Sequence, residues 1–193
     1  MSTNGRNTHK AVVGHFTGDQ MLTLLRTARA ASERDYLAVL LAYLHAMRAS
    51  EICQLRTPQV DTAGGFITVR RLKGSRTTLH ELTSDLKEPL LDERAALTVY
   101  MSKLKEGDRL FPFCRQHFYT LFCGYVKAAG LPSHLARVHN LKHSGLQDLA
   151  PLVSLPMLQR FSGHVSLSSL GRYIEPTMEQ ANAAVRAARQ VSA

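Results

Sequence analysis

Five polar features interrupt the apolar patterns of this chain, and their side chains are of kinds that bind anions or move protons. The stretch "LLAYLHAMRASEICQL", residues 40–55, has apolar residues at helical intervals and predicts a buried helix, yet it contains Arg48 and, three residues later, Glu51. The other four features are Lys73 in "LKGS", the segment "HNLKH" at 139–143, the "GH" pair at 163–164, and Tyr173 in "GRYIEP".

Each feature also has an ordinary structural interpretation. Arg48 and Glu51 can form an i,i+3 ion pair on a helix flank, which usually contributes little to stability. A lysine in a hairpin turn is normally a solvated charge, and a tyrosine on a short helix more often packs than reacts. A histidine after a glycine can simply end a helix. Taken singly, none of these features establishes a function.

A metal site is the sharpest alternative for "HNLKH". His139 and His143 lie at i,i+4, the spacing of helical zinc ligands, but the segment lacks the Glu of H-E-x-x-H, and His134 precedes the predicted helix. The cysteines have no metal-ligand spacing either. We therefore expect no metal here. On the other face, His139 and Lys142 at i,i+3 are placed to bind one anion together.

Composition favours a polyanionic partner. The chain has 193 residues, enough for one domain with a real core, and carries 24 Lys and Arg against 15 Asp and Glu, a formal charge of +9. Such a charge favours nucleic acid first and a membrane surface second. Cys53, Cys114 and Cys123 form no C-x-x-C pair, and no apolar leader or bilayer-length run is present. We expect reduced thiols and a cytoplasmic location.

The predicted elements form one domain. Residues 1–15 are polar and predict a flexible arm. Helices are predicted from the Thr17–Gln20 capping box, from Ser32, and over about 92–105, 114–129, 139–150, 156–162 and 166–174, with a last one from "TMEQ" at 177–180. The alternating segment 64–82 predicts two strands joined by a turn at 73–75. The pattern indicates a mostly α fold with a small antiparallel β-sheet, that is, α+β.

Taken in order, the polar features read Arg, hairpin Lys, His-x-x-Lys, Gly-His and Tyr, and in this the chain resembles the catalytic domain of the tyrosine recombinases, the phage integrase family. "HAMRASEICQL" is similar to the first arginine box, "ITVRRLKGSRTTLHEL" to the lysine hairpin, "HNLKHSGLQDLA" to the His-x-x-Arg box, and "FSGHVSLSSLGRYIEP" to the Gly-His and Tyr segment. The resemblance implies a catalytic domain over 16–176. It also implies a C-terminal helix over 177–193 that either docks on a neighbouring protomer or packs on its own domain.

The resemblance implies a site-specific recombinase or integrase that cleaves and rejoins DNA through a 3′-phosphotyrosyl intermediate, with no metal, ATP or other cofactor. Cationic donors suit this chemistry because the transition state concentrates negative charge on the phosphate oxygens. Glu51 would hold the fork of Arg48 in place. The expected catalytic residues are Arg48, Lys73 (general acid), His139 (general base), Lys142, His164 (phosphate donor) and Tyr173 (nucleophile). Expected DNA contacts are Arg70, Arg71 and Arg76, although strand alternation sends Arg70 and Arg71 to opposite faces.

Two departures from the family pattern qualify this expectation. Lys142 stands where most members have a second arginine, which keeps the charge but offers a point rather than a fork. Residues 1–15 are too short for the separate core-binding domain of most members. The chain is therefore expected to be either a single-domain member, as the invertases of fimbrial switches are, or a fragment or reduced element. The alternatives are a type IB topoisomerase-like nicking-closing enzyme and a non-catalytic DNA-binding relative. Expected partners are double-stranded DNA, further copies of the chain in a tetramer, and an accessory DNA-bending protein, in a nucleoid-associated complex.

Overall fold

The computed structural model describes residues 14–72 and 74–170, together with 182 and 186. Lys73, Tyr173 and the predicted arm and C-terminal helix lie outside the described residues, apart from positions 14, 15, 182 and 186. The described part is predominantly helical with one small antiparallel sheet, which confirms the expected fold class. None of its helices is long and apolar enough to cross a membrane.

Two capped helices form the centre of the core. Helix α1 (Gly18–Ala31) begins at the predicted capping box of Thr17 and Gln20, and α2 (Glu33–Leu44) begins where the Ser32 hydroxyl accepts from the Asp35 backbone N–H. Residues 35–42 of α2 are all buried, because this helix is covered on several sides by α1, α4 (Glu93–Met101) and α6 (His139–Leu149). The apolar run that the sequence showed is therefore the middle of the domain. The prediction of one helix over 40–55 is wrong, because α2 ends at Leu44 and a separate short helix begins at Ala49.

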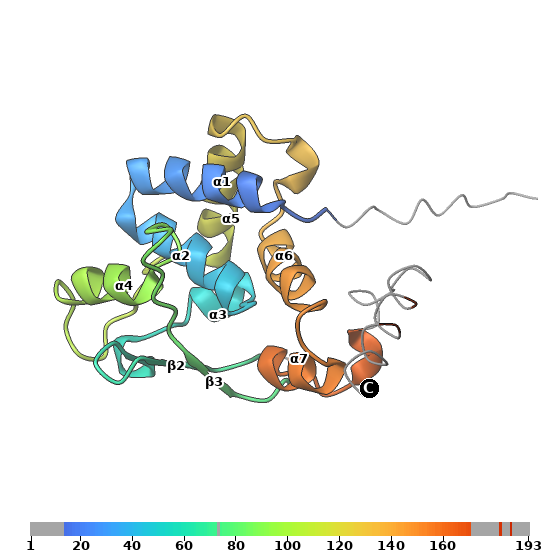
Figure 1. The fold of residues 1–193 in the computed structure, drawn as a ribbon. Coiled ribbons are helices and arrows are strands. Elements are labelled where there is room, and N and C mark those ends of the chain that lie inside the picture. Colours follow the sequence, from blue (N-terminus) through green and yellow to red (C-terminus); the bar gives the residue numbers. More distant parts are fainter. Residues whose placement is uncertain (1–13, 73, 171–181, 183–185, 187–193) are drawn as a thin grey trace, which may run out of the picture.

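The predicted hairpin is present and is part of a three-stranded sheet. Strand β2 (Phe66–Val69) pairs with β3 (Thr78–Glu81) in antiparallel register, Val69 facing Thr78. A short strand that the sequence did not predict, β1 (Val60–Asp61), follows the 3-10 turn η1 (Thr57–Gln59) and pairs with the other edge of β2. The sheet lies at one end of the molecule, while α1 and α5 (Arg115–Ala128) lie at the other (Figure 1).

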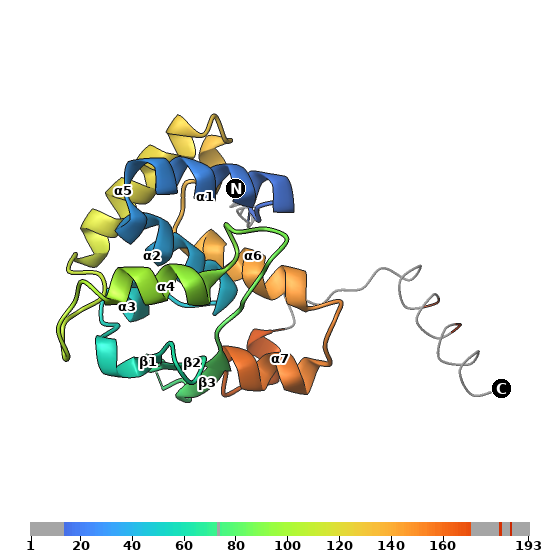
Figure 2. The same cartoon turned by 60° about the vertical axis from the view of Figure 1, so that its left-hand side comes forward.

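The later helices carry the remaining candidate residues. After the 3-10 turn η2 (Ser133–Leu135), α6 runs beside α2, and α7 (Leu155–Ser162) then packs against β3. Figure 2 shows α6 and α7 on the same side of the molecule, with α7 next to the sheet. The predicted helix at 166–174 is a 3-10 turn, η3 (Leu167–Ser169), as far as it lies within the described residues. The short helix α3 (Ala49–Ile52) follows α2 and precedes η1 in the chain.

Candidate active site

Arg48 is positioned by a sharp turn between α2 and α3. Ala46 in this turn has φ = 48°, the left-handed region that strains a residue with a Cβ. The turn is held by the Arg71 guanidinium, whose Nη1 donates to the Ala46 carbonyl and whose Nη2 donates to the His45 carbonyl, each at 2.9 Å. Arg48 then caps α3, with 28% of its side chain exposed. A strained, pinned turn thus presents one guanidinium to the surface.

Glu51 holds Arg48, as the sequence predicted. Its Oε1 accepts from Arg48 Nη1 at 2.8 Å and from the Leu72 backbone N–H at 3.1 Å, and its Oε2 accepts from the Arg48 backbone N–H at 2.8 Å. Burial alone would raise the pKa of this carboxyl, but the two backbone donors and the charges of Arg71 and Arg48 hold the pKa below its usual value. Glu51 is therefore a carboxylate that links α3 to the base of the hairpin.

The expectation that Arg71 contacts DNA is wrong. Its side chain has no exposed surface, and its guanidinium also bonds to Glu51 Oε2 at 3.3 Å and to the Phe161 carbonyl at 3.1 Å. Strand alternation explains the error, because one of two adjacent arginines must point into the molecule. Arg71 ties α2, the hairpin and α7 together, whereas Arg70 and Arg76 are exposed.

Helix α6 places His139 and Lys142 one turn apart near Arg48. Both line, with Arg48, Arg115 and Arg137, a cavity of about 660 Å³. Lys142 is buried, and its Nζ has no hydrogen-bond partner among the described residues. Burial, together with the charges of Arg71 and Arg48, lowers the pKa of Lys142 to about 7. A buried ammonium without a partner is costly, so the site is built to receive an anion.

His139 has the protonation state of a base. Partial burial of its ring and the charge of Arg137 lower the pKa of His139 below its usual value. The imidazole is therefore neutral at pH 7 and able to accept a proton. Its ring lies edge-on to that of His143, with centroids 5.3 Å apart. Among residues 14–72 and 74–170, no three His, Cys, Asp or Glu side chains converge as a metal site would require.

His164 follows the left-handed C-cap of α7. Gly163 has φ = 72°, and a Cβ there would lie 2.6 Å from the Arg76 carbonyl, so the position requires glycine. The Arg76 backbone N–H donates to the Gly163 carbonyl at 3.0 Å, which joins α7 to the hairpin. Burial and then the charge of Lys142 lower the pKa of His164 to about 4. The neutral ring lies 2.6 Å, through Nδ1, from the Ser162 hydroxyl.

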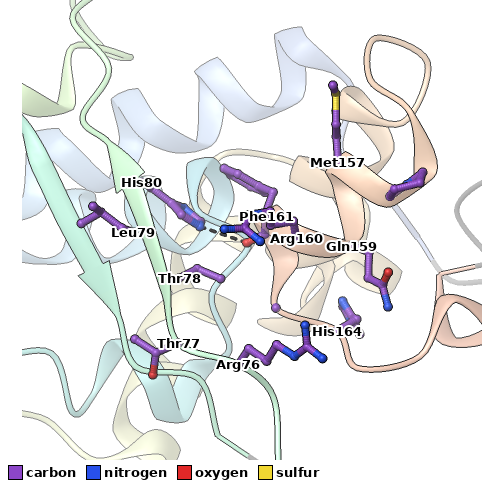
Figure 3. Close-up of a pocket in the computed structure, with 12 residues that line it drawn as sticks. Arg76, Thr77, Thr78, Leu79, His80, Met157, Gln159, Arg160, Phe161 and His164 are labelled. Atoms are coloured by element: carbon purple, nitrogen blue, oxygen red, sulfur yellow. Dashed lines mark hydrogen bonds between the residues drawn. The ribbon is translucent and has the colours of Figure 1, made fainter.

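Ser162 was not predicted from the sequence, yet it orients His164. For Nε2–H of a neutral His164 to donate to a phosphate, Nδ1 must accept from the Ser162 hydroxyl, in competition with the Gln159 carbonyl, which lies 3.3 Å from that hydroxyl and can accept the same proton. Ser162 is buried, so this hydroxyl is held in place. His164 and Arg76 line a second cavity of about 720 Å³ between β3 and α7 (Figure 3). Both cavities belong to one cationic region, because the charges of Lys142 and Arg48 act on His164.

A buried chain of polar side chains also escaped prediction. His45 Nε2 lies 2.7 Å from Glu93 Oε2, His45 Nδ1 lies 3.0 Å from His80 Nδ1, and His80 Nε2 lies 2.9 Å from the Phe161 carbonyl (Figure 3). Since a carbonyl only accepts, His80 donates from Nε2, and its Nδ1 must accept from His45. These contacts connect α2, β3, α4 and α7. They were not predicted because the residues that make them lie far apart in the sequence.

The chain is similar to known recombinases over most of its length. A model of the phage integrase family matches residues 15–180. The Type 1 fimbriae regulatory protein FimB of Escherichia coli K12 is 30% identical over 155 residues, 77% of each chain. The tyrosine recombinase XerA of Pyrococcus furiosus is 27% identical over 190 residues, 93% of this chain and 63% of that protein.

Solved structures share the fold. A crystal structure of XerA recombinase aligns with a TM-score of 0.73 at 19% identity, over 91% of this chain and 65% of that chain. A lambda integrase dimer bound to a COC′ core site aligns with a TM-score of 0.66 at 19% identity, over 83% of this chain and 47% of that chain. By the extent of the family match and the identity to FimB, the chain belongs to the phage integrase family.

Proposed function

We propose that this protein is a site-specific DNA recombinase that cuts and rejoins strands through a 3′-phosphotyrosyl intermediate. The observation that carries the proposal is the electrostatic coupling of His164, which lines one cavity, to Arg48 and Lys142, which line another, in a chain whose relatives include tyrosine recombinases. Arg48 is clamped by Glu51 on one side, and its contacts to the Ser75 hydroxyl are long, at 3.5 Å. Its outer N–H groups are therefore available to a phosphate.

The proposed reaction is an in-line exchange of two phosphate esters. The Tyr173 oxygen attacks phosphorus while its proton passes to His139, and the bond from phosphorus to the 5′-oxygen breaks as Lys73 gives that oxygen a proton. Arg48, Lys142 and His164 donate to the non-bridging oxygens, where negative charge increases in the transition state. Religation is the same sequence in reverse, with another 5′-hydroxyl as nucleophile.

Two finer points belong to this proposal. The phosphotyrosyl ester conserves the energy of the phosphodiester bond, so strand joining needs no ATP. The guanidinium and ammonium donors supply the positive charge at the phosphate, so we infer that no metal is required. Arg70 and Arg76 on the hairpin, both exposed, and Arg115 and Arg137 beside the first cavity are proposed to contact the DNA backbone.

The proposal also includes the domain boundaries of the chain and its assembly into a tetramer on DNA. We propose a flexible arm over 1–15, a catalytic domain over 16–176 and a helix over 177–193 that docks on a neighbouring protomer. Relatives in this fold include a lambda integrase tetramer bound to a Holliday junction, which supports a tetramer on DNA for this chain. A topoisomerase-like enzyme would act without such assembly, and a non-catalytic relative would form no covalent bond with DNA.

Covalent capture from cells tests the proposal and finds the DNA site. The protein is purified under denaturing conditions, and DNA fragments that remain bonded to it are sequenced. Wild-type protein is expected to retain fragments that end at a common position. Tyr173→Phe is expected to retain none while still binding DNA, because only the nucleophilic oxygen is lost. Tyr119→Phe is the matched control; adduct retained by Tyr173→Phe and lost by Tyr119→Phe would move the nucleophile.

A further inference from the structure

A third cavity, also cationic, lies beside the catalytic cluster and takes no part in the reaction proposed above. It has a volume of about 260 Å³ and shares Glu51 with the Arg48 site. This is below the roughly 300–1,000 Å³ of sites that enclose a whole small molecule, so it suits one small group of a larger ligand. Apart from Glu51, its lining residues are Gln54, Arg56, Gln59, Arg70 and Arg109.

The backbone forces two of these arginines together. Arg56 and Arg109 are partners in an isolated antiparallel bridge. The bonds that flank the pair run from Leu110 N–H to the Leu55 carbonyl and from Thr57 N–H to the Asp108 carbonyl, each at 3.0 Å. The pair is therefore of the non-hydrogen-bonded type, whose side chains emerge on one face about 5 Å apart. Like charges directly opposite each other destabilise a sheet, unless an anion lies between them.

No carboxylate in the cavity is free to neutralise these charges. Glu51 is already hydrogen-bonded to Arg48 and Arg71. The Arg56 guanidinium donates to one carbonyl, that of Gly107, at 2.6 Å, whereas Arg70 and Arg109 make no hydrogen bond or ion pair with the residues that the structure describes. The cavity therefore has a net positive charge and unused planar N–H donors.

The walls of the cavity are held in place. The Gln59 side chain accepts from the Arg56 backbone N–H at 3.1 Å through Oε1 and donates to the Thr68 carbonyl at 3.0 Å through Nε2, so it joins η1 to β2. Arg70 follows directly on β2. The arginines thus project from backbone segments that are fixed relative to one another, so the three side chains start from defined positions around the cavity.

We propose that Arg56, Arg70 and Arg109 bind a backbone phosphate of the DNA substrate, at a position other than the phosphate that is cleaved. Guanidinium forks match the two non-bridging oxygens of a phosphodiester. A duplex that places one phosphate at Arg48 presents further phosphates close by. Glu51 lines this cavity and also accepts from Arg48 Nη1, so the cavity lies next to Arg48. The inference rests on the proposed function in taking DNA as the ligand.

Salt-dependent binding tests this phosphate site. A duplex of about 30 base pairs and arbitrary sequence suffices, because phosphate contacts do not depend on sequence. Affinities are measured by fluorescence anisotropy between about 50 and 200 mM salt, on the Tyr173→Phe background so that no strand is cut. The test variant is Arg70→Gln/Arg109→Gln. The control, Arg26→Gln/Arg29→Gln, removes the same charge from α1, at the opposite end from the sheet (Figure 1).

The test variant is expected to reduce the slope of log affinity against log salt by about 0.9, the value for one phosphate contact, and the control to leave it unchanged. Equal slopes for the test variant and its parent would overturn the proposal. Inorganic phosphate provides a second arm, read as a rise in melting temperature. If Arg70→Gln/Arg109→Gln abolishes the rise in melting temperature but leaves the salt slope of DNA binding unchanged, the cavity binds free phosphate and the proposal of a DNA phosphate as its ligand is wrong.

The two proposals can fail separately. Equilibrium binding on the Tyr173→Phe background does not depend on whether Tyr173 reacts, so a wild-type protein that yields no covalent adduct overturns the recombinase proposal and leaves the slopes valid. Conversely, wild-type adduct with unchanged slopes overturns only the phosphate site. Because Arg70 and Arg109 are exposed and make no hydrogen bond among the described residues, each single variant is expected to fold and can replace the double variant.

Discussion

Lys142 is the side chain whose burial conflicts most directly with its charge. A lysine in a medium of low dielectric loses stabilisation by water, and Lys142 Nζ has no partner among the described residues to replace it. Burial lowers the pKa of Lys142 to about 7, so its neutral form becomes populated near neutral pH in the DNA-free protein. A phosphate would supply the missing partner and restore the charge.

We therefore expect a pH dependence that reports on this residue. At limiting DNA concentration, the rate of adduct formation should fall as the pH rises above about 7, because the pKa of Lys142 is lowered to about 7 and its cationic form is lost. Lys142→Arg should remain charged and keep its rate between about pH 7 and pH 9. Single-turnover rates across this range make the measurement.

The contribution of the Lys142 ammonium to the rate is tested by removing it. Lys142→Ala should reduce the rate by about 100- to 1,000-fold, the usual consequence of removing one donor to a developing negative charge. Wild-type rates for Lys142→Ala would show that this ammonium does not contact the phosphate. An identical decline with pH in Lys142→Arg and wild type would assign the titration to another group.

The helix that carries Lys142 is fixed by a glycine contact. Gly145 on α6 lies against α2, where a Cβ would meet the Tyr43 carbonyl oxygen. Gly124 on α5 is exposed, and a Cβ there would have no neighbour within 4 Å. The two glycines occupy helices of similar length, so they form a matched pair for testing how closely α6 must approach α2.

Gly145→Ala should destabilise the protein by about 1–3 kcal/mol, the range for overpacking a core. Gly124→Ala should stabilise it by up to about 1 kcal/mol, because alanine favours an exposed helix interior over glycine. Urea unfolding compares the two. The close approach of α6 to α2 would be contradicted if both variants were equally stable.

The buried chain from Glu93 to Phe161 should make folding sensitive to acid. Burial, followed by the charges of His45 and Arg71, lowers the pKa of His80 to about 3. Glu93 faces His45 from α4, and the Phe161 carbonyl faces His80 from α7. Since His80 has an unfolded pKa near 6.5, the unfolded state binds a proton below pH 6.5 that the folded state does not bind. The free energy of unfolding must then fall as the pH falls from 6.5 towards 3.

His80→Asn should remove the contribution of His80 to the pH dependence of the free energy of unfolding. Between pH 7 and pH 5 wild type is expected to lose about 2 kcal/mol more than His80→Asn, since one unmatched proton changes stability by about 1.4 kcal/mol per pH unit. The readout is the difference between urea unfolding free energies at the two pH values, which separates this effect from the general cost of the substitution. His117→Asn, at an exposed position, is the control. A pH dependence shared by wild type and His80→Asn would place the titration elsewhere.

The whole molecule carries a strong positive charge. The formal charge is +9, so phosphate contacts should dominate affinity for DNA. A single protomer offers the catalytic face and the hairpin, whereas a tetramer multiplies these contacts on one DNA. Linked sites raise affinity through effective concentration without any new type of contact.

We therefore expect weak, strongly salt-dependent binding of one protomer to a single half-site. Two half-sites on one duplex should bind cooperatively, with occupancy rising more steeply than for two independent sites. Gel-shift titrations of both duplexes, built on the site found by covalent capture, make the comparison. Tight and salt-insensitive binding of a monomer to one half-site would contradict this.

Local patterns in the sequence were enough for the starts of α1 and α2 and for the hairpin, but not for the turn that breaks the segment 40–55 between α2 and α3. Capping at Thr17, the apolar period of residues 36–44 and the alternation of 66–81 depend on neighbours within a few positions, so they can be recognised without the fold. The contact between Arg48 and Glu51 is similarly local, since it spans one helical turn.

The roles that depend on burial could not be read in this way. Two adjacent arginines look alike in the sequence, and only packing against Ala46 and Phe161 makes Arg71 internal while Arg70 stays exposed. The contacts of His45 with His80 and Glu93, and the bridge that sets Arg56 opposite Arg109, join residues 35 to 53 positions apart. Such contacts arise from how helices and strands pack, and packing depends on the shape of the whole core rather than on any one segment.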